Sequence, residues 1–173
     1  YGGFQWGNQG RDKIGGGRGN DTLHGGALDD RFYFEFSQVG EGNDRIVAGG
    51  GNDVLEGGDG ADTILGQGGA DSIVGGEGAD SLVGGSGSDT ISGGSDDDTL
   101  KGGGGSDLLD GGTGNDSIVA GGGADTVSGG EGDDTIRNNG GADSLDGGAG
   151  NDVLSGGDGA DVLNGGGGND VLD

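Results

Sequence analysis

The chain has 173 residues, of which 54 are glycine and 4% are aromatic, and it carries a formal net charge of −25. Low hydrophobicity with a large charge of one sign is typical of disordered chains, so a hydrophobic core alone is not expected to fold it. Seven dispersed Lys and Arg residues exclude a basic nucleic-acid-binding face, and the absence of Cys excludes disulfides and thiolate metal sites.

A nine-residue repeat organises nearly the whole chain. Residues 1–6 form an N-terminal flank, three units span 7–33, a five-residue insertion occupies 34–38, and fifteen contiguous units fill 39–173. The consensus is G-G-x-G-x-D-x-U-x, where U is a large apolar residue. Position 6 is Asp and position 8 is Ile, Leu, Val or Phe in all eighteen units, and so strict a period predicts a repeat architecture.

Aromatic residues are confined to the first 36 positions, where Phe32, Phe34 and Phe36 alternate into the insertion. Alternation at period two predicts that one strand is lengthened there. The extended strand and its loop would either decorate one coil or form a docking surface for another domain.

Each unit is expected to contribute one short strand. Positions 7 to 9, such as Thr63, Ile64 and Leu65, are predicted to form it with the middle residue pointing inward, and G-G-x-G-x-D to form the turn. Two units then complete a coil, and about nine coils stack into an all-β, parallel β-roll solenoid with two facing sheets. Each position-6 Asp would lie about 4.8 Å from the Asp one coil further on.

Rows of carboxylates beside glycine-rich turns suit a hard cation, because calcium takes carboxylate and carbonyl oxygens at about 2.3–2.6 Å. The sequence therefore predicts calcium binding by the Asp at position 6 of every unit. These residues are Asp12, Asp21, Asp30, Asp44, Asp53, Asp62, Asp71, Asp80, Asp89, Asp98, Asp107, Asp116, Asp125, Asp134, Asp143, Asp152, Asp161 and Asp170.

The pairing of units one coil apart sets the expected number of ions. About 14–16 Ca²⁺ ions, carrying about +28 to +32, would offset the charge of −25. Glycine at positions 2 and 4 provides the positive φ that the turn requires. The sites beside Leu28, Gln67 and Asp96, which replace those glycines, are expected to be the weakest.

No catalytic centre is predicted within the chain. The single histidine, His24, is far in sequence from any nucleophile, and the Ser residues lack the G-x-S-x-G elbow. A row of equivalent Asp residues also lacks the one asymmetric carboxylate pair of a glycosidase.

Position 9 of alternate units forms an apolar row on one outer face. The row consists of Val47, Leu65, Val83 and Val119, interrupted by Lys101. These residues are either solvated strand residues or a surface for side-by-side packing against another chain.

The eighteen units resemble the RTX (repeats-in-toxin) nonapeptide, the calcium-binding parallel β-roll of secreted bacterial proteins, along nearly the whole chain. The resemblance implies a right-handed roll with calcium along both edges, type I secretion, and folding outside the cell. In that family the sixth-position Asp binds metal, and each Asp of the series from Asp12 to Asp170 matches it.

The expected function is that of a non-enzymatic, calcium-binding structural module, located outside the cell or on the bacterial cell surface. Because it has no initiating Met, the chain is expected to be a segment of a larger protein, such as a surface layer, a filament or an adhesin spacer. The alternative is the C-terminal secretion and folding module of a secreted protease, lipase, epimerase or haemolysin.

Calcium ions are the expected partners of the chain. Stacking, lateral self-association or docking to adjacent domains is a further option. No nucleic acid is expected to bind, and no apolar run reaches the roughly 20 residues of a membrane-spanning helix.

Overall fold

A computed structural model describes residues 4–7, 13–14, 20–28, 30–32, 40 and 42–173. The predicted strand extension at 34–38 and the predicted metal ligand Asp12 both lie outside this part of the chain. The described residues form strands and turns, and none of their segments is a helix of the length and apolarity that crossing a membrane requires.

Two parallel sheets make up the fold, and the chain alternates between them. The first sheet contains β1 (Phe4–Trp6), β3 (Thr22–Ala27), β5 (Arg45–Gly50), β7 (Thr63–Gly68), β9 (Ser81–Ser86), β11 (Thr99–Gly104), β13 (Ser117–Gly122), β15 (Thr135–Arg137), β16 (Gly140–Gly141), β18 (Val153–Ser155), β19 (Asp158–Gly159) and β21 (Val171–Leu172). The second sheet contains β2 (Lys13–Ile14), β4 (Arg31–Phe32), β6 (Val54–Asp59), β8 (Ser72–Glu77), β10 (Thr90–Ser95), β12 (Leu108–Thr113), β14 (Thr126–Glu131), β17 (Ser144–Ala149) and β20 (Val162–Asn164).

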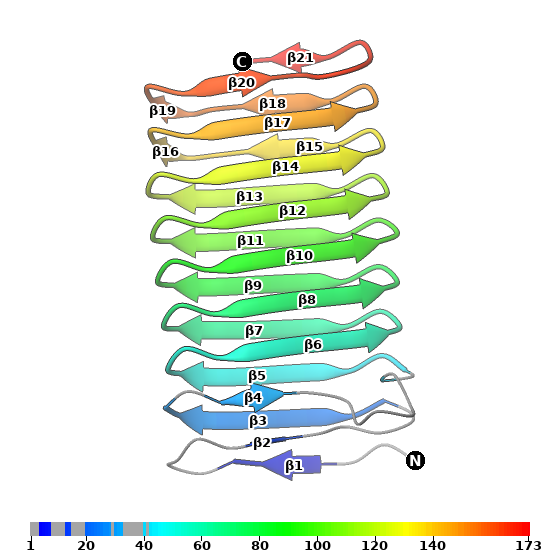
Figure 1. Ribbon diagram of the computed structural model, residues 1–173, viewed down its shortest axis with the longest axis vertical. Helices are drawn as coiled ribbons and strands as arrows, with labels where there is room; N and C mark the ends of the chain where they lie inside the picture. Colours follow the sequence, from blue (N-terminus) through cyan, green and yellow to red (C-terminus); the bar gives the residue numbers. More distant parts are fainter. Residues whose placement is uncertain (1–3, 8–12, 15–19, 29, 33–39, 41) are drawn as a thin grey trace.

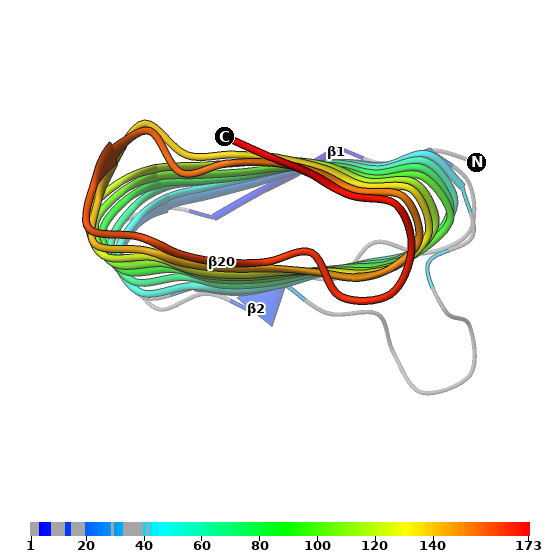
Figure 2. The same cartoon turned by 90° about the horizontal axis from the view of Figure 1, so that it is seen from above.

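Strand register follows the eighteen-residue coil. In the first sheet Thr63 pairs with Ser81 and Ile64 with Leu82, each eighteen residues apart, and all paired strands are parallel. Figure 1 shows the coils stacked along one axis, and Figure 2 shows that each coil is flattened, with the two sheets facing each other. The predicted parallel β-roll, with two nonapeptides per coil, is confirmed.

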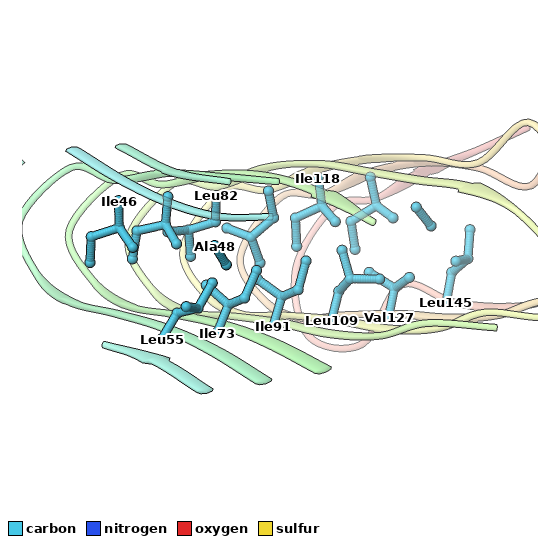
Figure 3. Packing of buried hydrophobic residues seen from close by; sticks show 14 of the residues in the cluster. Ile46, Ala48, Leu55, Ile73, Leu82, Ile91, Leu109, Ile118, Val127 and Leu145 are labelled. Carbon is cyan, nitrogen blue, oxygen red and sulfur yellow. The ribbon is translucent and has the colours of Figure 1, made fainter. Parts of the chain in front are cut away.

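The core is a single apolar stripe between the sheets. Position-8 side chains fill it, and Ile64, Leu82 and Leu100 in the first sheet have no exposed surface. In Figure 3 the labelled side chains Ile46, Leu82 and Ile118 point from one sheet toward Leu55, Ile73 and Ile91 on the other. This confirms the assignment of position 8 to the core from Ile14 to Leu154, apart from Phe32, whose side chain is not described.

The prediction that all of G-G-x-G-x-D forms the turn is wrong for its first three residues. Strand β6 runs through positions 7 to 9 of one unit and positions 1 to 3 of the next, and Gly58 pairs in register with Gly76. Stacking of equivalent coils supplies a hydrogen-bond partner for these backbone groups, and this outweighs the low strand propensity of glycine. Only positions 4 to 6 remain as the turn.

Candidate metal centre

Successive coils stack so closely that a Cβ added to a glycine at position 2 or position 4 collides with the backbone one coil earlier. Gly76 at position 2 has φ of 127° and Gly78 at position 4 has φ of 113°. A Cβ on Gly76 would collide with the carbonyl oxygen of Gly58, and one on Gly78 with that of Gly60, each one coil earlier. Glycine therefore provides both the positive φ and the close backbone approach at the edge of the roll.

Position-6 aspartates line each edge in a buried ladder. From Asp30 to Asp152 each of them is 1–2% exposed, whereas Asp161 and Asp170 on the last coils are partly exposed. The backbone N–H of each Asp donates to Oδ1 of the Asp one coil further on, at 2.8 Å from Asp62 to Asp80. This bond recurs at 2.7–3.0 Å from Asp44 through Asp170, so one oxygen of each carboxylate is fixed by the preceding coil.

The second oxygen of these carboxylates, Oδ2, is buried and accepts no hydrogen bond. This holds for Asp44, Asp62, Asp71, Asp80, Asp89, Asp98, Asp107, Asp116, Asp134, Asp143 and Asp152. A buried carboxylate oxygen without a donor is costly, and most such atoms in proteins are paired with hydrogen-bond donors or metal ions. The edges of the roll therefore hold a regular series of oxygens that lack a positive partner.

Backbone carbonyls converge on the same small spaces. A Cβ on Gly57 would collide with Asp62 Oδ2 and lie 2.5 Å from the carbonyl oxygen of Gly75. The same relation joins Gly93 to Asp98 Oδ2 and to the carbonyl oxygen of Gly111. Each space is thus bordered by a carboxylate from one coil and a carbonyl from the next.

Burial and neighbouring charge raise the pKa of the ladder carboxylates. Burial is the main reason that the pKa of Asp80 rises to about 7, and the carboxylates of Asp62 and Asp98 one coil away add to it. The hydrogen bond from the Asp62 backbone N–H acts in the opposite direction but does not offset the rise. Burial also raises the pKa to about 6 at Asp62, Asp71, Asp98 and Asp134.

This donor set fits calcium. Within the described residues no three His, Cys, Asp or Glu side chains form a cluster that could hold a metal ion by themselves. A cation at the edge would instead be held by one or two Asp carboxylates together with backbone carbonyls. An all-oxygen donor set of this kind suits a hard cation such as Ca²⁺ and does not suit zinc or copper.

The three residues expected to weaken their sites all keep the left-handed backbone of the glycine that they replace. Leu28, Gln67 and Asp96 have φ of 84°, 82° and 77°, and they are the non-glycine residues with positive φ in the described chain. Asp96 compensates in part, because its Oδ2 accepts a 3.1 Å hydrogen bond from the backbone N–H of Gly78. The left-handed backbone of the glycine is therefore preserved at each position, with local backbone strain.

Asn138 is a further departure from the consensus, and the sequence patterns at positions 2 and 4 did not indicate its effect. Asn138 stands at position 1 and is 5% exposed, and its Oδ1 accepts hydrogen bonds from the backbone N–H groups of Gly121 and Asn139. It divides the usual six-residue strand into β15 and β16. Its side chain also partly offsets the rise in the pKa of Asp125.

A second ladder, at position 5, was also missed. The side chain of Asn115 accepts a 2.9 Å hydrogen bond from the backbone N–H of Asp133, and Asp133 accepts one of 2.7 Å from Asn151. These bonds run in the opposite direction to those of the position-6 ladder, and they continue from Asp97 to Asn169. The frequent Asn, Asp and Ser residues at position 5 were the available signal, since such side chains often bond to nearby backbone groups.

One family of known proteins matches the repeats that form this ladder. The family model described as RTX calcium-binding nonapeptide repeat (4 copies) matches residues 6–35, 38–73, 65–100, 74–109, 101–136 and 137–172. No curated protein matches the chain. The family matches thus cover both the three-unit and the fifteen-unit segments in which the position-6 ladder was identified.

Proposed function

The chain belongs to the RTX calcium-binding nonapeptide repeat family, and on that basis we propose that its position-6 Asp residues hold calcium ions between successive coils. The observation that carries this proposal is the buried Oδ2 of residues such as Asp62 and Asp80, which accepts no hydrogen bond. One carboxylate oxygen is fixed by the preceding coil, and the other remains available to a cation.

Calcium is then the ligand that allows the roll to fold. Two carboxylates about 4.8 Å apart repel each other by about 3.5 kcal/mol at an effective dielectric constant of 20, and this repulsion recurs along both edges. A divalent ion in each gap replaces repulsion by attraction. Because the site exists only in the folded roll, the free energy of binding is also free energy of folding.

The module acts outside the cell, as is characteristic of this family of secreted bacterial proteins, and it acts by binding metal rather than by catalysis. We favour a structural segment of a surface layer, filament or adhesin. Support comes from the constant register of the strands from β5 to β14, which makes a rigid and uniform rod. The alternative context is the secretion and folding module of a larger secreted enzyme or toxin.

A calcium titration followed by circular dichroism tests the folding role. We expect a cooperative gain of β signal from a disordered start, reversal by EGTA, and little response to magnesium at the same concentration. Calorimetry on the same samples should give about 14–16 bound ions per chain if every predicted pair is occupied. A chain that is fully folded without calcium would contradict the proposal.

A further inference from the structure

Over the coils from β5 to β17, charged side chains on the two outer faces of the roll are segregated by sign, whereas Arg31 in β4 and Asp158 in β19, on the end coils, depart from this pattern. The first-sheet face is the outer surface of β5, β7, β9, β11, β13 and β15, and its charged residues are Arg45, Lys101 and Arg137. The second-sheet face is the outer surface of β6, β8, β10, β12, β14 and β17, and its charged residues are Glu56, Asp59, Glu77, Asp110, Glu131 and Asp146. Within these strands one face is therefore basic and the other acidic.

The two faces also differ in shape. The second-sheet face presents Val54, Val74 and Leu108, which are 43%, 42% and 50% exposed. The first-sheet face instead ends its strands in residues that are mostly glycine, and a Cβ added to Gly50 or Gly104 would meet no atom within 4 Å. The second-sheet face thus carries exposed apolar side chains, here called the projections, at Val54, Val74 and Leu108. The first-sheet face carries a row of strand-end glycines, here called the strip, which includes Gly50 and Gly104.

Two of these apolar residues, Val54 and Leu108, lie on the same coil and at the same edge as an open glycine, whereas Val74 is the third residue of β8 and lies nearer the middle of the face. Strand β5 ends at Gly50 and the next strand begins, after one turn, at Val54, so both residues lie at one edge of one coil (Figure 1). Gly104 and Leu108 are related in the same way through β11 and β12. Consider two rolls with parallel axes, one shifted relative to the other along the direction perpendicular to the sheets. The first-sheet face of one roll then meets the second-sheet face of the other, and the strip of the first faces the projections of the second.

The charges match in the same arrangement. At the opposite edge Arg45 begins β5, and Asp59 ends β6. Near the middle of the faces, Lys101 and Asp110 occupy position 9 of consecutive units, as do Arg137 and Asp146. In this arrangement the facing pairs are Arg45 with Asp59, Lys101 with Asp110, and Arg137 with Asp146.

We propose that the partner of both faces is a second copy of this chain, and that the first-sheet face of one roll packs on the second-sheet face of the next with their axes parallel. Because the operation is a translation between two different surfaces, it does not close, and copies associate in open rows. The inference rests on the proposed function, since both faces exist only in the calcium-folded roll.

Interface size sets the expected strength. A six-residue strand is about 20 Å long and six coils span about 29 Å, which gives roughly 600 Å² per face, or about 1,200 Å² in total. This is the lower end of the range for specific interfaces, so association should be reversible and concentration-dependent. It should also weaken with added salt, because three facing pairs are charged.

Sedimentation velocity and circular dichroism, measured together in saturating calcium, test the proposal. We expect the wild-type chain to associate as its concentration rises, and the variants K101E/R137E and D110K/D146K each to fold normally but remain monomeric. An equimolar mixture of the two should associate again, because the reversed charges are complementary between them. Gly104→Leu should also stay monomeric, since its side chain would project into the strip from a Cβ that meets no atom of its own roll within 4 Å.

A charge control separates this interface from general repulsion. K101Q/R137Q removes two positive charges from the first-sheet face, whereas A79E/A142E adds two negative charges at exposed turn positions outside both faces. Only the first variant should lose association. Association that persists in both charge-reversal variants, or a folded wild type that stays monomeric at about millimolar concentration, would overturn the inference. Loss of calcium-induced β signal would instead overturn the proposed function itself.

Discussion

The backbone N–H of Asp62 donates a 2.8 Å hydrogen bond to Oδ1 of Asp80, whereas Oδ2 of Asp80 is buried and accepts no hydrogen bond. One oxygen of the carboxylate is thus fixed by a hydrogen bond from the preceding coil, and the other has no hydrogen-bond donor. The proposed calcium site rests on this division, since the fold itself satisfies only one of the two oxygens. In that site the backbone of the preceding coil fixes Oδ1, and the cation would neutralise the charge at Oδ2.

Replacement of one ladder carboxylate should separate metal binding from apo stability. In Asp80→Asn the amide oxygen can still accept the bond from Asp62, but the charge that attracts calcium is lost. We expect the calcium-linked free energy of folding to fall by about 1–3 kcal/mol and the calcium midpoint for folding to rise, because a charge-assisted ligand is removed. A calcium titration monitored by circular dichroism measures the shift. Asp158→Asn, the same change on an exposed strand residue, should leave the midpoint unchanged.

Two glycines of different position should respond in opposite ways to alanine. Gly76→Ala places a Cβ against the carbonyl oxygen of Gly58 at φ of 127°, and we expect a loss of about 1–3 kcal/mol or more in stability. Gly104→Ala meets no atom within 4 Å and should stabilise the roll by up to about 1 kcal/mol, by restricting the unfolded chain. Urea unfolding in saturating calcium gives both values. Equal effects of the two substitutions would contradict this account of the turn.

Restoring glycine should strengthen an irregular position of the repeat. Gln67 has φ of 82°, so Gln67→Gly relieves strain of about 1–2 kcal/mol at the cost of about 0.5–1 kcal/mol in chain entropy. We expect a small net gain in stability and a lower calcium midpoint. Asp96→Gly should gain less, because it also removes the hydrogen bond from Gly78. A loss of stability in Gln67→Gly would contradict this account, because it would mean that backbone strain at Gln67 does not outweigh the entropy cost of glycine.

The column of Asp residues and the column of core residues were predictable because a strict period places position 6 and position 8 alike in every coil. The participation of Gly58 in a strand was not predictable from propensity, since it depends on pairing with Gly76 eighteen residues away. The bond between Asn115 and Asp133 has the same origin. Sequence patterns therefore indicated which side chains face inward, whereas contacts between coils required the three-dimensional register.

Acid should stabilise the calcium-free roll. Burial raises the pKa of Asp80 to about 7 and that of Asp62 to about 6, both well above the ordinary value of 3.8. A group whose pKa is higher in the folded state stabilises the fold fully below its unfolded pKa, and this contribution is lost as the pH rises through the folded value. In calcium-free buffer we therefore expect β signal to increase as the pH falls from about 8 to about 4.

The calcium-loaded roll should show the opposite dependence, because protons and calcium compete for the same carboxylates. We expect the calcium midpoint to rise as the pH falls from about 7 to about 5, across the pKa values of Asp80 and Asp98. Circular dichroism titrations at several pH values measure this shift. Asp80→Asn should reduce both dependences, whereas Asp158→Asn should preserve them. A calcium midpoint independent of pH would mean that the buried ladder carboxylates do not hold the ions, since these are the groups that must lose a proton to bind them.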